Sequence, residues 1–186
     1  RALRSRGVEA GAMKPVASGG RRTTQGLVSE DAELLQKAYS PADPLELINP
    51  LCLELPLAPS VAAELAGKKI EMEGVWKAYE TLRRRHSFLV VEGVGGLMVP
   101  IWEEYLVIDL VREMGFPLLI VARPGLGTIN HTLLTIAAAR DYGLKIQGFL
   151  INGYREEEAG LAERTNPAQI EKLGQVPLLG VLPYDP

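Results

Sequence analysis

Apolar and polar positions along the chain form blocks that predict strands followed by helices. Short apolar runs flanked by glycine or proline predict strands of a parallel sheet that are buried on both faces, and longer stretches with apolar residues three or four positions apart predict amphipathic helices. The predicted strands cover residues 8–16, 87–91, 116–122, 144–151 and 178–182. The predicted helices cover residues 30–40, 60–65, 71–85, 106–114, 129–142 and 167–173. This alternation predicts an α/β fold with a mostly parallel central sheet and helices on both faces.

The segments between these elements are predicted to be irregular. Residues 21–28 form a polar loop, and residues 41–60 form a long proline-rich connection of a kind that is often functional in a compact domain. Leu34 is expected on the buried face of the helix over 30–40. Thr128 is predicted as an N-cap, and Pro167 is predicted in the first turn of the last helix.

The composition limits the classes of function. A length of 186 residues with 47% hydrophobic and 23% charged positions suits a single domain over residues 1–186. The net charge of −3 gives no support for nucleic-acid binding, and no apolar run is long enough to span a bilayer. The one cysteine, Cys52, excludes an internal disulfide and has no histidine or cysteine cluster for zinc. We expect a cytoplasmic protein that binds neither nucleic acid nor membranes.

The opening residues, Arg1–Val8, predict the end of a helix that is stopped by Gly7. A helix tail that leads directly into a strand indicates that a strand and a loop precede residue 1, so we expect the chain to be truncated. The pattern G-x-x-x-x-G-K-[ST], which binds nucleotide phosphates, does not occur in the sequence. We expect that loop in the upstream segment.

Four polar side chains stand at predicted strand ends or helix starts, namely Lys14, Asp31, Glu92 and Asn152. Each has a simple structural explanation when taken alone, for example a solvated lysine or an acid favoured by a helix dipole. Ligands in open parallel sheets bind outside the carboxyl ends of the strands, however, where these residues should meet. Two carboxylates with a lysine suit a magnesium–phosphate site, and an asparagine amide can pair with the edge of adenine. Together they predict a nucleotide site.

These motifs, in this order, resemble the dethiobiotin synthetase family over nearly the full chain. The matching segments are Lys14-Pro15-Val16-Ala17-Ser18-Gly19, Ser29-Glu30-Asp31-Ala32, and residues 90–96, 127–135 and 182–184. The resemblance implies a P-loop NTPase-like three-layer sandwich and a homodimer with its substrate site at the interface. It also implies a ligase that uses ATP and Mg²⁺ to join CO₂ to 7,8-diaminononanoate, giving dethiobiotin, ADP and phosphate through a carbamate and a carbamic-phosphoric anhydride.

The resemblance further implies roles for individual residues. Lys14 would steady the carbamate and the transferring phosphoryl group, and Asp31 and Glu92 would hold magnesium. The expected substrate contacts are Lys14, Ser18, Val94 and Gly95, with Thr128, Ile129 and Asn130 of the partner subunit. The expected nucleotide contacts are Asp31, Glu92, Gly93, Val94, Gly95, Asn152, Gly153, Pro183, Tyr184 and Asp185. Gly153 departs from the family pattern, which often has arginine after the asparagine.

Three other interpretations stay open at this point. A P-loop amidoligase of cobalamin synthesis would usually carry a further glutaminase domain with a nucleophilic cysteine, and Cys52 has no histidine partner. A non-enzymatic, partition-type regulatory ATPase would need an amphipathic membrane-targeting tail or a basic face, and the acidic balance supports neither. The third is a scaffold that has lost its activity.

Overall fold

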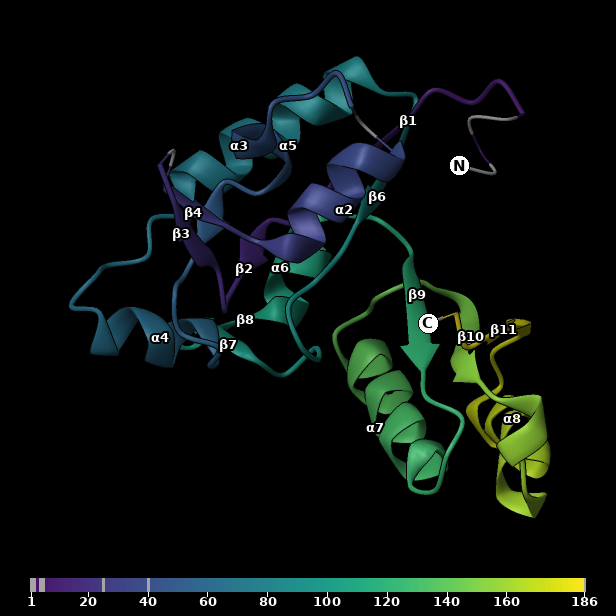
Figure 1. Ribbon diagram of the computed structural model, residues 1–186. Coiled ribbons are helices and arrows are strands. Elements are labelled where there is room, and N and C mark those ends of the chain that lie inside the picture. Colours follow the sequence, from purple (N-terminus) through teal and green to yellow (C-terminus); the bar gives the residue numbers. More distant parts are fainter. Residues whose placement is uncertain (1–2, 4–5, 25, 40, 186) are drawn as a thin grey trace. The chain divides into compact units, whose positions relative to one another are not determined.

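The computed structural model describes residues 3, 6–24, 26–39 and 41–185 (Figure 1). The predicted helix tail at Arg1–Arg6 therefore falls largely outside the described residues. The chain forms two compact units, Arg1–Val107 and Ile108–Pro186. Within the described ranges, no helix has the length and apolar character needed to cross a membrane. A single domain over residues 1–186 stays a prediction.

Two parallel strands, β1 and β6, form the centre of the first unit (Figure 1). The strands of this unit are β1 (Ala10–Met13), β2 (Val16–Ala17), β3 (Arg21–Thr23), β4 (Gly26–Val28), β5 (Leu51–Cys52), β6 (Phe88–Val91), β7 (Pro100–Trp102) and β8 (Tyr105–Leu106). Its helices are α2 (Glu30–Tyr39), α3 (Leu45–Ile48), α4 (Pro59–Leu65) and α5 (Glu73–Arg85). All four residues of β1 are buried, because α2, α3 and α5 contact this strand. The core of the unit therefore forms around β1.

The register of β1 and β6 determines which side chains emerge together at their carboxyl ends. Met13 pairs with Val91, so the two strands end level with each other. The backbone N–H of Glu92 then donates a hydrogen bond to the carbonyl of Met13, at 2.8 Å. Lys14 and Glu92 consequently leave the sheet side by side.

The prediction of irregular structure for residues 21–28 and 41–60 is wrong in part. Strands β3 and β4 form an antiparallel hairpin, in which Thr23 pairs with Gly26. Helix α3 and strand β5 lie within the proline-rich connection, and β5 pairs in parallel with β2. The residues between Glu92 and helix α6 (Val107–Met114) likewise contain the small β7–β8 hairpin. These elements are too short to produce a clear hydrophobic period, so only tertiary pairing reveals them.

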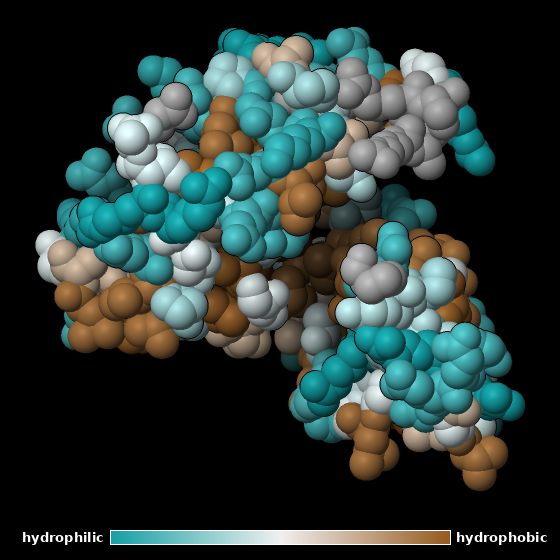
Figure 2. Space-filling view, in the orientation of Figure 1, coloured by the Kyte–Doolittle hydropathy of each residue, from teal (hydrophilic) through white to brown (hydrophobic). Residues whose placement is uncertain are grey.

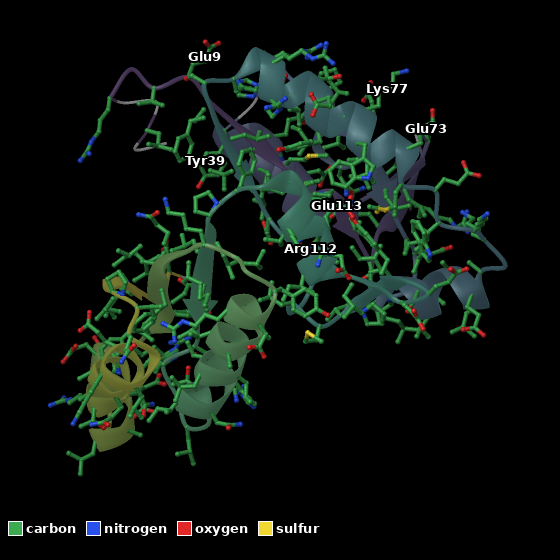
Figure 3. The ribbon with its side chains drawn as sticks, turned by 180° about the vertical axis from the view of Figure 1, so that it is seen from behind. Glu9, Tyr39, Glu73, Lys77, Arg112 and Glu113 are labelled. Carbon is green, nitrogen blue, oxygen red and sulfur yellow. The ribbon has the colours of Figure 1, made fainter. Side chains whose placement is uncertain are left out.

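The long helix α5 has the amphipathic pattern that its sequence predicts. Its buried residues are Val75, Ala78, Tyr79 and Leu82. Glu73 and Lys77 project outward from the opposite side (Figure 3). In α2 the expected orientation is wrong, because Leu34 is 65% exposed and Ala32 is the buried residue. A short helix with few apolar residues does not fix its buried face from periodicity alone.

Hydrophobic residues remain exposed on parts of the first unit. Strand β6 was expected to be buried on both faces, but Phe88 is 47% exposed and Val90 is 38% exposed. In the described chain β6 pairs only with β1, which explains this exposure. A second apolar surface lies over α4, where Figure 2 shows a brown patch. Val61 and Leu65 of this helix are 41% and 67% exposed.

The second unit is a three-stranded parallel sheet with the order β11–β10–β9. Its elements are α6 (Val107–Met114), which begins at the last residue of the first unit, β9 (Leu118–Ala122), α7 (Thr128–Asp141), β10 (Ile146–Tyr154), the 3₁₀ turn η1 (Glu156–Glu158), α8 (Leu161–Gly174) and β11 (Leu178–Pro183). Helices α7 and α8 pack against each other and against the sheet. The buried core between them comprises Ile120, Ala122, Ile136, Phe149, Ile151, Ile170 and Val176.

Three boundaries in this unit differ from the predicted ones. Strand β10 continues to Tyr154, so Asn152 and Gly153 lie inside the strand and not after it. Helix α7 is capped by Gly127, at φ +90°, and Thr128 is its first residue. Helix α8 begins six residues earlier than Pro167, where the Glu163 carboxylate accepts a hydrogen bond from the Gly160 N–H at 3.0 Å. A glycine at the N-cap position gives no side-chain signal to mark these helix starts.

Gly148 should be intolerant of any side chain. It has a φ of +153°, and a Cβ at this position would lie 2.6 Å from the carbonyl oxygen of Pro177. We expect Gly148→Ala to lower the free energy of unfolding by about 2–4 kcal/mol, through backbone strain and overpacking. Denaturant unfolding followed by circular dichroism measures this change.

Gly143→Ala is the matched control for this substitution. Gly143 also has a positive φ, +70°, but a Cβ there would meet no atom within 4 Å. Only backbone strain applies, so we expect a loss of about 1–2 kcal/mol. Equal losses for the two variants would contradict the role assigned to crowding at Gly148.

Candidate functional site

Lys14 is a buried lysine at the carboxyl end of β1. Lys14 is 5% exposed, and it directly follows a strand that consists of apolar residues. Pro15 follows it and has no backbone N–H, so the strand cannot continue as a regular ladder. The Lys14 N–H donates to the carbonyl of Ile48 at 2.7 Å, which holds the backbone just before this break.

The Lys14 ammonium group lies between two carboxylates. Its Nζ atom is 2.6 Å from Asp31 Oδ2 and 2.8 Å from Glu92 Oε1. Glu92 directly follows β6, and Asp31 lies in the first turn of α2, where the helix dipole favours an acid. Three elements that are distant in the sequence thus bring one cation and two anions together.

The two carboxylates keep Lys14 charged. Burial lowers the pKa of a lysine, because it removes water from the ammonium group. The hydrogen bonds from Lys14 to Asp31 and Glu92, together with the negative charges of both acids, outweigh burial, so the pKa of Lys14 is raised above its ordinary value. Lys14 is therefore a fixed positive charge over the whole physiological pH range.

Asp31 and Glu92 could hold a divalent cation. Their side chains are 55% and 48% exposed, so a ligand can reach them, and both contact the same nitrogen atom, which brings their oxygens close together. Within the described ranges, no cluster of three or more His, Cys, Asp or Glu side chains is placed to form a closed metal cage. Mg²⁺ commonly binds through one or two carboxylates, with water and substrate phosphates as its other ligands. The donor set therefore fits magnesium with a nucleotide.

The loop after Glu92 presents backbone beside this cluster. Gly93 and Gly95 are exposed, and Val94 is partly buried. Gly95 has a φ of +64°, and a Cβ there would lie 2.9 Å from Val99 Cγ2. Any residue other than glycine would therefore strain this turn, and the peptide groups of the loop are left free of side-chain cover.

Ser18 lies on a loop that is attached to a neighbouring segment by backbone hydrogen bonds. The Ala17 carbonyl accepts from the N–H of Leu53 at 2.9 Å, and the Gly19 N–H donates to the carbonyl of Leu55 at 3.2 Å. Ser18 itself is partly exposed. The loop that carries Ser18 is thus held in place on both sides, and Ser18 keeps part of its surface exposed.

The residues expected at the nucleotide base belong to the second unit and lie on adjacent strands. Asn152 on β10 is in register with Leu182 on β11, and Tyr154 is in register with Pro183. The N–H of Tyr184 donates to the carbonyl of Tyr154 at 2.8 Å. These contacts bring Asn152, Pro183 and Tyr184 to the same edge of the sheet.

Arg155 joins this group and was not identified from the sequence. Its guanidinium carbon lies 3.4 Å from the centre of the Tyr184 ring, in a cation–π contact. Both side chains are exposed. Nothing in the sequence pairs Arg155 with Tyr184, because they meet only through the register of β10 and β11.

Thr128 lines a hollow of about 310 Å³ at the start of α7, together with Arg123 and His131. Ile129 and Asn130, expected beside it at the substrate, do not line this hollow. The Arg123 guanidinium lies 3.4 Å from His131 Nδ1. The positive charge of an arginine and the backbone N–H groups at the start of a helix both favour the binding of an anion.

The chain matches a family described as "AAA domain" over residues 1–186. The ATP-dependent dethiobiotin synthetase BioD of Thermodesulfovibrio yellowstonii is 40% identical over 99% of this chain and 80% of its own length. The enzymes of the same name from Bacillus velezensis and Methanocaldococcus jannaschii are 43% and 37% identical, over 98% and 97% of this chain and 76% and 82% of their own lengths.

A solved structure supports the fold. The MinC:MinD cell division protein complex of Aquifex aeolicus aligns with the whole chain and 73% of its own chain, with a TM-score of 0.53 at 16% identity. At this identity the likeness concerns the fold alone. With the mostly parallel strands, it confirms the predicted α/β fold of the P-loop NTPase type.

The charge of Lys14 should contribute to stability in a way that depends on pH. Because its pKa is raised in the folded protein, the contribution is complete below about pH 10, the region where an unfolded lysine titrates, and it is lost as the pH rises through the raised pKa. We expect the free energy of unfolding to fall more steeply as the pH rises above about 10 in the natural protein than in Lys14→Met.

Urea unfolding at a series of pH values measures this difference. Lys77→Met removes an exposed lysine from α5 and controls for the loss of one positive charge. If Lys14→Met had the same alkaline slope as the natural protein, the two carboxylates would not stabilise the charged form of Lys14.

Proposed function

The chain belongs to the ATP-dependent dethiobiotin synthetase family, and from this premise we propose that it closes the ureido ring of dethiobiotin. The reaction joins CO₂ to 7,8-diaminononanoate and converts ATP to ADP and phosphate. The single observation that carries the proposal is the placement of Lys14 between Asp31 and Glu92 at the carboxyl ends of β1 and β6. A cytoplasmic location is part of the same proposal.

The proposed reaction has three balanced steps. One amine of the substrate adds to CO₂ and loses a proton, which gives a carbamate. A carbamate oxygen then attacks the γ-phosphorus of ATP, and ADP leaves with the electrons of the broken P–O bond. The second amine attacks the carbonyl carbon of the mixed anhydride, phosphate leaves, and the amine releases a proton as the ring closes.

Lys14 serves the second and third steps in this proposal. Both the carbamate and the transferring phosphoryl group are anionic, and phosphoryl transfer depends mainly on positioning and on stabilising negative charge. A lysine that stays protonated and is held by two acids meets this need, because its charge is already oriented before the substrates arrive. Lys14 is therefore the proposed catalytic residue.

Asp31 and Glu92 are the proposed magnesium ligands. When it is bound, magnesium neutralises charge on the nucleotide phosphates. The two exposed carboxylates supply hard oxygen ligands and leave other positions for phosphate and water. Both acids also contact Lys14, so the same pair of side chains orients the ammonium group and the metal.

The remaining expected residues complete the proposed binding sites. Ser18 would hydrogen-bond the diamine end of the substrate, and the peptide groups of Val94 and Gly95 would face its amine. We propose a homodimer in which Thr128, Ile129 and Asn130 of the partner subunit receive the substrate carboxylate. Gly93 and Gly153 would lie beside the nucleotide, and its base would contact Asn152 and residues 183–185.

Replacement of Lys14 should abolish ring closure while the fold survives. We expect Lys14→Ala to reduce dethiobiotin formation from diaminononanoate, CO₂ and ATP by at least about 10³-fold, since the charge at the reacting atoms is lost. Product is measured by mass spectrometry, and circular dichroism checks the fold. A turnover close to that of the natural protein would remove Lys14 from the mechanism.

Replacement of Asp31 should affect the nucleotide through magnesium. Asp31→Asn keeps the shape of the side chain but removes one charged metal ligand. We expect it to weaken ATP binding about tenfold or more at saturating Mg²⁺, with little change when EDTA is present. Calorimetric titration at several Mg²⁺ concentrations measures this effect, and Glu30→Gln, an exposed acid in the same first helical turn, is the control. If the affinity stayed the same at every magnesium concentration, Asp31 would pair with Lys14 and stabilise the start of α2 without binding the metal.

A further inference from the structure

Two proline-containing segments run in parallel next to Lys14. Val16 is in register with Leu51, and Ala17 is in register with Cys52. Counting back along both segments places Pro15 opposite Pro50 and Lys14 opposite Asn49. The hydrogen bond from the Lys14 N–H to the carbonyl of Ile48, at 2.7 Å, agrees with this extended register.

The parallel pairing of these two segments is interrupted at the prolines. The Lys14 N–H donates to the carbonyl of Ile48, and the Ala17 carbonyl accepts from the N–H of Leu53. Residues that bond to the same neighbour in a parallel ladder are an even number of positions apart, so the ladder is not continuous between Lys14 and Ala17. Pro15 and Pro50 have no N–H to donate at this break.

The side chain of Asn49 supplies a hydrogen-bond donor to the Lys14 carbonyl at this break. Its Nδ2 atom donates to the carbonyl of Lys14 at 2.7 Å and to the carbonyl of Leu51 at 3.1 Å. An asparagine amide has two N–H groups, so it can serve both carbonyls at once. The backbone of Asn49 is itself fixed at the end of α3, where its N–H donates to the carbonyl of Leu45 at 2.8 Å.

We propose that Asn49 is a positioning residue that sets the direction of the Lys14 side chain by holding the Lys14 carbonyl. The proposal rests on the proposed function insofar as Lys14 acts on the substrates. Lys14 begins where β1 stops and a proline follows, so its peptide lacks the restraint of a continuous ladder. With the N–H held by Ile48 and the carbonyl held by Asn49, the peptide planes on both sides of Lys14 are fixed.

Loss of the amide should release Lys14 without unfolding the protein. A cavity of about 540 Å³ borders Asn49, so water can reach the freed carbonyl in a shortened variant. Water can satisfy the carbonyl, but it does not fix the orientation of the peptide. A small rotation there moves Nζ, at the far end of a long side chain, away from Asp31 and Glu92.

The test compares Asn49→Ala with Gln36→Ala in the full chain. Gln36 is a matched control, because its Nε2 atom also donates to a backbone carbonyl, that of Asp43, at 2.8 Å, and it is also partly buried. Two measurements are made on each variant. One is the pH dependence of acetylation of Lys14 in the absence of nucleotide, followed by peptide mass mapping, and the other is kcat and KM for dethiobiotin formation.

We expect Asn49→Ala to acetylate at Lys14 several-fold faster than the natural protein at the same pH, because the amino group is no longer held between Asp31 and Glu92. We expect kcat to fall about 10- to 100-fold, the range found for groups that orient active-site ligands, with a smaller change in KM for ATP. Gln36→Ala should match the natural protein in both measurements. Unchanged acetylation and kcat in Asn49→Ala would overturn the proposal.

If Asn49→Ala does not fold, Asn49→Ser, which keeps a shorter donor, is measured instead and should show smaller changes in the same directions.

The two measurements also separate this proposal from the proposed function. Acetylation of Lys14 requires no turnover. Faster acetylation in Asn49→Ala, with no dethiobiotin formed by the natural protein, would support the positioning role and reject the synthetase function. Normal turnover by the natural protein, with Asn49→Ala unchanged in both measurements, would support the function and reject the positioning role.

Discussion

The Lys14 ammonium group between Asp31 and Glu92 is the interaction around which the ends of β1 and β6 and the start of α2 are arranged. A buried positive charge is unfavourable unless it is paired and hydrogen-bonded. In this fold, two carboxylates lie within hydrogen-bonding distance of Lys14 Nζ. The register of β6 with β1 places Glu92 beside Lys14, and Asp31 lies in the first turn of α2. The positions of three elements are thereby linked to a single charge.

The proximity of these three residues was predictable from the sequence, because parallel strands end at the same edge of a sheet and acids favour helix starts. The position of Asn49 was not predictable, since its side chain bonds to a backbone carbonyl of a segment 35 residues away across a pairing with no hydrophobic period. The β3–β4 hairpin was missed for the same reason. Sequence patterns report burial along one element, whereas these features depend on which elements become neighbours.

The second unit shows a different limit of sequence interpretation. Its strands and long helices lie where the pattern predicts them, but the boundaries shift wherever glycine replaces a capping side chain, as at Gly127 and Gly160. The extension of β10 to Tyr154 places Asn152 within a strand, where register with β11 fixes its neighbours. Arg155 meets Tyr184 through that register, so its contact could not be read from either sequence segment alone.

The raised pKa of Lys14 also decides which amine can react with CO₂ in the proposed reaction. CO₂ adds to an amine only when the nitrogen lone pair is free, and a protonated lysine has none. A buried lysine with a lowered pKa would compete with the substrate and block its own site as a carbamate. Held by two acids, Lys14 stays protonated and does not compete with the substrate amine for CO₂ at the proposed site of carbamate formation. The same ion pairs that orient its charge therefore protect the enzyme from modification by its own substrate.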